Sequence, residues 1–173
     1  MSLFRKGLLI AAITFALDQL VKAYFLYGLG WIESLNGLRV ENINVLPVFD
    51  FVMVWNHGIS YGLLQASSSF ERWLLTLFAL GVVAFLVWWL RGVQELRLAQ
   101  AIGLIIGGAL GNVIDRILYG AVADFFYLYG FGYDWYVFNV ADTAVVLGVL
   151  IMGLDLVLNE WRSRATRAKE DQT

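Results

Sequence analysis

The chain has 173 residues, of which 60% are hydrophobic and 15% are charged, and its formal net charge is −2. This composition is too apolar for an ordinary soluble domain and indicates a membrane protein. There is no cysteine and only one histidine, His57. The absence of cysteine excludes disulfides, zinc thiolate sites and thiol nucleophiles. The lone histidine leaves too few nitrogen ligands for a typical transition-metal site, and we expect no serine triad around it.

Four apolar runs are long enough to cross a hydrocarbon core of about 30 Å. They predict helices over residues 7–27, 70–90, 98–118 and 137–158. The first run follows the basic residues Arg5 and Lys6, and a cleaved signal sequence also begins with basic residues followed by an apolar stretch. It is too long for one, however, and Asp18 and Lys22 interrupt it with no small-residue cleavage site after them, so we expect a retained helix.

Two segments between the runs are predicted to lie outside the membrane. Residues 28–69 are more polar, and within them Val48 to Trp55 is rich in β-branched and aromatic residues, which predicts a short sheet that leans on the helices or the lipid headgroups. The edge of such a sheet is a platform for an extended peptide. Residues 119–136 are expected to form an outer loop that contains Asp124 and an exposed Asp134.

The predicted fold class is therefore a membrane all-α protein, with four transmembrane helices, a small extracytoplasmic β-sheet platform and an outer loop between the third and fourth helices. We expect residues 1–173 to form one integral membrane domain. Glycines 103, 107 and 111 are spaced four apart in the third run, a pattern that allows close helix contact, although chance is an alternative in a chain with 17 glycines.

The basic residues set the expected orientation. One side of the four-helix arrangement carries most of them: Arg5, Lys6, Arg91, Arg97, Arg162, Arg164, Arg167 and Lys169. The positive-inside rule then places both termini in the cytoplasm and both larger loops outside.

Polar residues from three of the predicted helices converge toward the outer leaflet. Asp18 precedes Lys22 by four residues, the favourable order for an ion pair on one helix face. In the third helix the polar residues Asn112, Asp115 and Arg116 share a face, and Asn139 and Asp142 fall in the first turns of the fourth. Asp155 lies near the inner end and does not join them. Such residues can simply hold helices together, and for Asp18, Lys22, Asn112 and Asn139 that alternative stays open.

With cysteine, triad and metal chemistry set aside, a pair of carboxylates that share one proton is the remaining route to hydrolysis. One carboxylate draws a proton from water while its protonated partner polarises the carbonyl. Asp115 precedes Arg116, which suits an ionised structural pair. Asp124 has apolar neighbours that favour its protonated form, so Asp124 and Asp142 are the preferred catalytic dyad.

Five strings of this chain resemble the bacterial lipoprotein signal peptidases, also called signal peptidase II. They are DQLVK at 18–22, WNHGISYG at 55–62, GGALGNVIDR at 107–116, GAVADF at 120–125 and FNVADT at 138–143. Together they fall in three of the four predicted helices and in both outer segments, in the order of the family. Three departures, Val21, Tyr61 and Ala123, leave every carboxylate in place.

The resemblance implies an aspartic-type endopeptidase of the bacterial inner (cytoplasmic) membrane that cuts prolipoproteins before a diacylglyceryl-modified cysteine. It implies Asp124 and Asp142 as catalytic residues, and Asn56, Asn112, Arg116 and Asn139 as residues that orient the substrate or an antibiotic such as globomycin. Asp18 and Lys22 match positions that brace the site. No cofactor, metal or nucleic acid is implied.

Two other classes of function remain as alternatives. A small transporter or proton-conducting bundle tends to distribute titratable groups through the membrane depth or to show internal repeats, whereas the polar residues of this chain gather on one side and no repeat is visible. A non-enzymatic assembly or anchoring protein would leave the buried aspartates unexplained.

Overall fold

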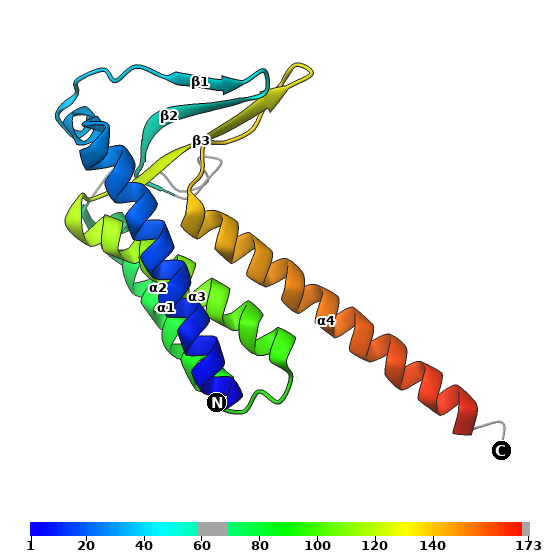
Figure 1. Ribbon diagram of the computed structural model, residues 1–173. Helices are drawn as coiled ribbons and strands as arrows, with labels where there is room; N and C mark the ends of the chain where they lie inside the picture. The colour runs from blue at the N-terminus through cyan, green and yellow to red at the C-terminus, as the bar shows by residue number, and fades with distance from the viewer. Residues whose placement is uncertain (59–68, 171–173) are drawn as a thin grey trace.

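The computed structural model describes residues 1–58 and 69–170, and it places a small sheet at one end of a set of long helices (Figure 1). Within the described residues, four helical segments are long and apolar enough to cross a membrane: Leu3–Gly28, Ser69–Leu90, Leu96–Leu118 and Val140–Leu158. The prediction of four membrane-spanning helices with a small sheet is confirmed.

The first helix begins earlier than predicted and ends in an irregular segment. Helix α1 (Leu3–Ala23) starts after Ser2, whose hydroxyl accepts a hydrogen bond from the Arg5 amide at 3.4 Å. It continues as one turn of π-helix, η1 (Tyr24–Gly28), followed by the 3-10 helix η2 (Trp31–Asn36). The apolar run alone did not reveal the N-cap at Ser2.

Helix α3 (Leu96–Leu118) lies at the centre of the bundle, in contact with α1, α2 (Ser69–Leu90) and α4 (Val140–Glu170). The predicted close contact along its glycines is confirmed. A Cβ atom at Gly103 would meet the Gly7 carbonyl oxygen of α1, and one at Gly107 would meet the Ala11 carbonyl oxygen. The missing side chains therefore let the backbones of α1 and α3 approach each other.

The sheet is antiparallel, with the strand order β1-β2-β3-β4. Its strands are β1 (Ile43–Leu46), β2 (Phe49–Asn56), β3 (Val122–Gly130) and β4 (Tyr133–Asp134). The strand expected at 48–55 is confirmed as β2. The prediction that residues 119–136 form a loop is wrong, because β3 lies within them and pairs with β2. Its sequence, VADFFYLYG, lacks the alternation of polar and apolar residues that would have indicated a strand.

Aromatic side chains attach the sheet to α1 and its extension. Phe25, Trp31 and Phe125 form a buried cluster, in which the rings of Phe25 and Phe125 stack at 4.3 Å between centroids. The sheet therefore leans on the helices, as expected for a segment too small to build its own core.

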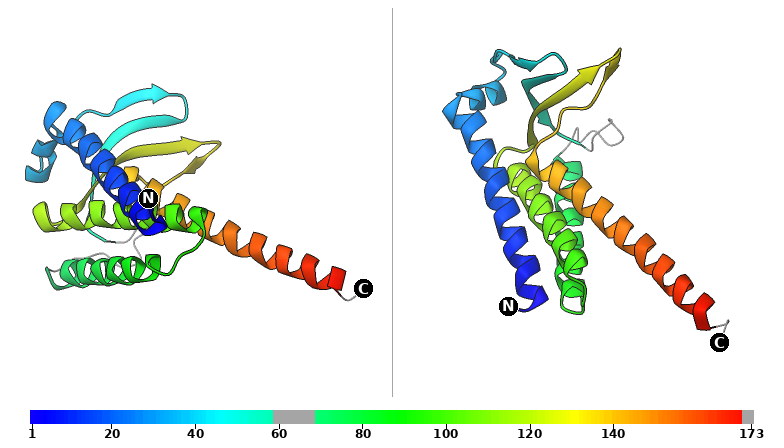
Figure 2. Two further views of the ribbon diagram at one scale, coloured as in Figure 1. Left: turned by 60° about the horizontal axis from the view of Figure 1, so that its bottom comes forward. Right: turned by 45° about the vertical axis from the view of Figure 1, so that its right-hand side comes forward.

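Helix α4 diverges from the other three helices, so that its C-terminal end lies apart from the N-terminus of α1 (Figures 1 and 2). It begins at Val140 rather than at residue 137, because Asn139 caps it, and it continues to Glu170, beyond the apolar run that ends at residue 158. Its first residues stay close to α1 and α3, at the same end of the bundle as the sheet.

Candidate active site

The end of the bundle nearest the sheet holds a cluster of buried polar side chains. Asp18, Lys22, Asp115, Asp124 and Asn139 are each at most 2% exposed. They come from α1, α3, β3 and the residue before α4. The predicted convergence of polar residues from three helices is confirmed, and strand β3 adds a fourth element.

Asp142 is held at the N-terminus of α4 by a reciprocal cap. The Asn139 side-chain oxygen accepts a hydrogen bond from the Asp142 amide at 2.9 Å, and the Asp142 carboxylate accepts one from the Asn139 amide at 3.2 Å. This is the capping-box arrangement, with Asn in place of Ser or Thr and Asp in place of Glu. The carboxylate thus lies at the positive end of a helix dipole, where a negative charge is favoured.

Asp124 occupies the third position of β3 and is only 1% exposed. One carboxylate oxygen accepts a hydrogen bond from the Asn139 amide group at 2.7 Å, and the other accepts one from the Asn56 amide group at 3.0 Å. Asn56 is the last residue of β2 and pairs with Val122, two residues before Asp124. The β2–β3 pairing therefore brings Asn56 to the carboxylate.

Two asparagine side chains link Asp124 to Asp142. The Asn112 amide nitrogen donates to Asp142 at 2.8 Å, while the Asn139 amide nitrogen donates both to Asp124 and, at 3.1 Å, to the Asn112 side-chain oxygen. Each carboxylate is thus separated from the other by a short chain of amide groups. Among the predicted site residues, Asp124, Asp142, Asn112 and Asn139 are therefore joined in one chain of hydrogen bonds.

Burial raises the pKa of Asp124 to about 8, and the nearby negative charge of Asp142 adds to the increase. The hydrogen bonds from Asn56 and Asn139 and the charge of Lys22 act in the opposite direction, but they do not outweigh desolvation. At neutral pH the Asp124 carboxyl is therefore mostly protonated. This agrees with the expectation that its apolar neighbours favour the neutral form.

A second network lies directly below, around Lys22. The lysine ammonium is 2.8 Å from Asp18 and 2.8 Å from Asp115, and it donates to the Asn112 side-chain oxygen at 3.3 Å. The predicted Asp18–Lys22 ion pair is confirmed. The sequence interpretation linked Asp115 to Arg116, but its ion-pair partner is Lys22, because successive residues on a helix point in different directions. Asp115 also accepts a hydrogen bond from the Ala123 amide at 3.1 Å, next to Asp124.

Asp18 connects α1 to the start of α4, since its carboxylate accepts a hydrogen bond from the Ala141 amide at 2.9 Å. Gln19 was missed by the sequence interpretation. Its amide nitrogen is 3.1 Å from Asp18 and 3.4 Å from Asp115, so it donates to both carboxylates. A polar residue inside an apolar run, beside Asp18, was the signal that could have identified it.

Arg116 borders the site on the side of the β2 end. Its guanidinium donates to the carbonyl oxygens of Asn112 and Gly58, each at 3.3 Å, and its buried Nε atom has no hydrogen-bond partner among the described residues. The Asn56 side-chain oxygen accepts from the Gly58 amide at 3.0 Å, which directs its amide nitrogen toward Asp124. The rest of the WNHGISYG string, with Tyr61, lies outside the described residues.

Two other aspartates lie away from the cluster. Asp134 is exposed, as expected, and accepts a hydrogen bond from the Tyr127 hydroxyl at 2.9 Å. Asp155 is buried in α4, about 20 Å along the helix axis from Asp142. Among the described residues, no group of three or more His, Cys, Asp or Glu side chains is arranged to hold a metal ion.

Comparisons with known proteins agree on one family. Residues 10–158 match the family described as signal peptidase (SPase) II. The chain is 45% identical to a lipoprotein signal peptidase of Methylorubrum extorquens (strain PA1), over 90% of this chain and 87% of that protein. It is 43% identical to a lipoprotein signal peptidase of Methylobacterium radiotolerans, over 99% of this chain and 97% of that protein.

The fold has also been seen in a solved structure. A bacterial membrane enzyme determined by the in meso method at 2.3 Å resolution superposes with a TM-score of 0.74 at 27% identity, covering 90% of this chain and 89% of that one.

Proposed function

The chain belongs to the signal peptidase II family of lipoprotein signal peptidases, and we propose that it is an intramembrane aspartic-type endopeptidase in which Asp124 and Asp142 activate water. Its substrates are prolipoproteins modified with diacylglycerol, cut just before the lipidated cysteine. The observation that carries the proposal is the chain of amide groups between the two buried carboxylates, through Asn112 and Asn139.

The two carboxylates have different surroundings, which assigns them different roles. Asp124 holds a proton at neutral pH because burial raises its pKa to about 8, so it acts as the acid. Asp142 lies in the first turn of α4, where the helix dipole favours an anion, whereas Asp124 lies on a strand, so Asp142 acts as the base.

In the first step Asp142 takes a proton from water, and the water oxygen bonds to the carbonyl carbon of the scissile peptide. Asp124 gives its proton to the carbonyl oxygen as negative charge develops there. In the second step the tetrahedral intermediate collapses, Asp142 passes its proton to the leaving nitrogen, and Asp124 regains a proton from the hydroxyl. Each carboxyl group ends in the protonation state in which it began.

The surrounding residues have supporting roles in this proposal. Asn56, Asn112, Asn139 and Arg116 orient the carboxylates and the substrate, because each donates a hydrogen bond at or beside the dyad. The network of Asp18, Lys22 and Asp115 braces the three helices beneath them.

The proposed membrane is the bacterial inner membrane, with both termini in the cytoplasm and the active site toward the periplasm. The sheet and the dyad lie at the same end of the membrane-spanning helices (Figure 1). A substrate with two acyl chains presents its cleavage site at that boundary of the bilayer. Globomycin is the proposed inhibitor, as a peptide that occupies the same site.

The test is cleavage of a synthetic lipidated prolipoprotein peptide by the purified protein, without added metal or nucleotide. Asp124→Asn and Asp142→Asn should each abolish detectable cleavage. Acid–base catalysis usually contributes about 10²- to 10⁴-fold to the rate, so we expect each variant to lose at least that factor in cleavage rate. The matched control is Asp134→Asn, which makes the same change at an exposed aspartate outside the site. Turnover by a folded Asp124→Asn or Asp142→Asn protein would refute the dyad.

A further inference from the structure

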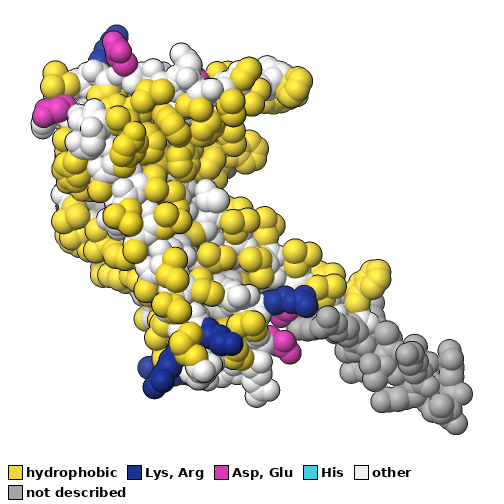
Figure 3. Space-filling model, in the orientation of Figure 1, with side chains coloured by type: hydrophobic (Ala, Val, Ile, Leu, Met, Phe, Trp, Pro, Cys, Tyr) yellow, Lys and Arg dark blue, Asp and Glu magenta, His cyan; other side chains and the backbone are white. Residues whose placement is uncertain are grey.

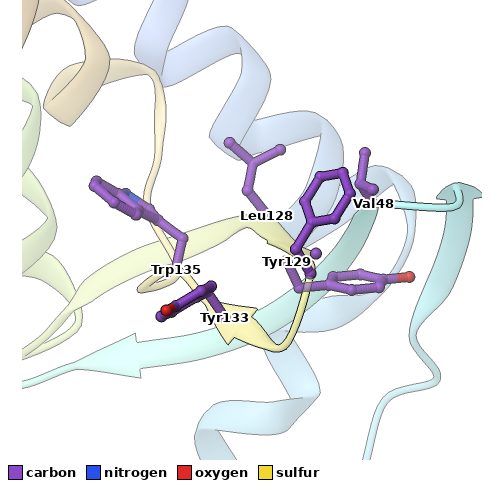
Figure 4. A pocket seen from close by; sticks show the side chains of 7 residues that line it. Val48, Leu128, Tyr129, Tyr133 and Trp135 are labelled. Atoms are coloured by element: carbon purple, nitrogen blue, oxygen red, sulfur yellow. The ribbon is translucent and has the colours of Figure 1, made fainter.

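The hairpin that joins β3 to β4 exposes large aromatic side chains at the free end of the sheet. Phe131 is fully exposed, at 101% of its reference surface, and Tyr133 and Trp135 are 81% and 55% exposed. Figure 4 shows Tyr133 and Trp135 with Val48, Leu128 and Tyr129 around a shallow apolar pocket of about 330 Å³. At about 25 cal/mol per Å², leaving such rings in water has a free-energy cost.

The backbone of the hairpin makes this phenylalanine unusual. Phe131 has φ 53°, and it is the one non-glycine residue with a positive φ in the described chain. It is followed by Gly132 at φ 79°. A bulky side chain in this region costs about 1–2 kcal/mol relative to glycine, so the turn itself does not explain why phenylalanine stands there. Because the ring is fully exposed, packing against the described residues does not offset this cost.

The charge of the hairpin favours a lipid interface over water or a charged partner. Residues 125–140 contain no lysine or arginine, and their single acidic residue is Asp134. Its carboxylate accepts a hydrogen bond from the Tyr127 hydroxyl on the neighbouring strand. Tyrosine and tryptophan beside an exposed apolar ring are the composition typical of a membrane–water interface.

The position of the hairpin makes contact with the bilayer possible. The sheet extends sideways from the bundle as an arm, on the side toward which α4 diverges, and the hairpin forms the end of that arm (Figures 1 and 3). Hydrophobic side chains cover much of this arm and of the helices in the same view (Figure 3). The helices present exposed apolar residues for lipid contact, such as Leu147 and Leu150 on α4.

We propose that the hairpin of residues 130–135 inserts Phe131, Tyr133 and Trp135 into the boundary between lipid headgroups and acyl chains, on the side of the membrane where the sheet lies. The hairpin is thereby a membrane anchor separate from the four spans. From Asp124 to Gly130 strand β3 spans about 20 Å, at 3.3 Å per residue. The anchor holds one end of this stretch and η1, through Phe25, holds the other, so together they fix the depth of Asp124.

The proposal is tested by site-directed spin labelling, for which the chain is well suited because it has no native cysteine. Phe131→Cys and, separately, Tyr133→Cys are labelled with a nitroxide in the full-length protein in phospholipid nanodiscs. Power saturation compares the access of oxygen, which concentrates in lipid, with the access of a water-soluble nickel chelate. We expect both labels to be more accessible to oxygen, at a depth of roughly 5–10 Å, as for interfacial apolar side chains.

Two reference positions calibrate the result. Leu150→Cys on α4 supplies the lipid-facing value, and Glu41→Cys, exposed in the segment before β1, supplies the water-facing value. Labels at 131 and 133 that behave like the label at 41 would overturn the proposal. Because the measurement requires no substrate, its result is independent of whether the proposed catalytic dyad is correct.

Discussion

Replacing Asn56 by leucine removes one hydrogen-bond donor from Asp124 while keeping a side chain of similar size. The Asn56 amide nitrogen lies 3.0 Å from the carboxylate and stabilises its ionised form, which lowers the pKa of Asp124. Loss of this donor therefore raises that pKa further above 8. In the proposed mechanism Asp124 must be protonated, so activity is lost as the pH rises through its pKa.

The size of the shift follows from the strength of the bond. A hydrogen bond to a charged group contributes about 1.5–3 kcal/mol. At 1.36 kcal/mol per pKa unit, this corresponds to about 1–2 units. Asn56 is only partly buried, so water replaces part of the lost interaction, and we expect about one unit. The alkaline limb of kcat/KM should move from about pH 8 to about pH 9, while the acidic limb, set by Asp142, stays in place.

The assay measures kcat/KM between pH 5 and 10 with a lipidated peptide that has no titratable side chain near the cleavage site. Trp55→Phe is the matched control, because it removes a hydrogen bond from the neighbouring residue of β2, to the Ser34 hydroxyl, without touching a carboxylate. An alkaline limb that stays at the same pH in Asn56→Leu, or that moves to lower pH, would refute the assignment of Asp124 as the acid.

Two further predictions concern stability. Asp115→Asn leaves the Lys22 ammonium with one carboxylate instead of two and should cost about 3 kcal/mol, the lower end of the range for breaking a buried ion pair, since Asp18 still neutralises the lysine. Denaturation in detergent measures this, and a stable but inactive variant would instead make Asp115 a candidate for direct catalysis. Gly107→Ala should cost about 1–3 kcal/mol, because its Cβ would meet the Ala11 carbonyl oxygen of α1. Gly81→Ala is the control, because no described atom outside its own stretch of helix lies within 4 Å of its added Cβ, and an equal loss in both variants would contradict the close α1–α3 contact.

The features that the sequence predicted well are those that a single element determines. Four apolar runs predict four helices because a helix that crosses a membrane requires about 20 apolar residues, and this requirement does not depend on contacts with the rest of the chain. The Asp18–Lys22 pair was predictable from its spacing on one helix. The spacing of Asn139 and Asp142 carries a further signal: Asn followed by Asp three residues later is a variant of the capping box, and it indicates a helix that starts at Val140, as α4 does.

The features that the sequence did not predict depend on contacts between distant elements. Asp115 was linked to Arg116, its neighbour in the chain, whereas its partner Lys22 lies on another helix. The sequence of strand β3 predicts a loop because both faces of the strand are largely apolar or aromatic: one face packs on Phe25, and the strand starts within the buried site. The same burial raises the pKa of Asp124. Burial of the start of β3 therefore explains both why the strand lacks alternating polar residues and why Asp124 is expected to act as the acid.

The balance of charges in the site gives an independent reason for a dyad that shares one proton. Asp18, Asp115, Asp124 and Asp142 are carboxylates, and the nearby cations are Lys22 and Arg116. Lys22 lies between Asp18 and Asp115, while Arg116 interacts electrostatically with Asp124 and Asp142. If all four carboxylates were ionised, the described cluster would hold two uncompensated negative charges in a poorly solvated region.

One proton on the dyad reduces this excess to a single charge. Asp18 and Asp115 each form an ion pair with the Lys22 ammonium, at 2.8 Å. Of the two remaining carboxyl groups, Asp142 lies at the positive end of a helix, whereas Asp124 lies on a strand with no such dipole. The network of Asp18, Lys22 and Asp115 therefore contributes to the chemistry as well as to stability: because it places two carboxylates around one lysine, a proton on Asp124 is the least costly way to limit the negative charge of the site.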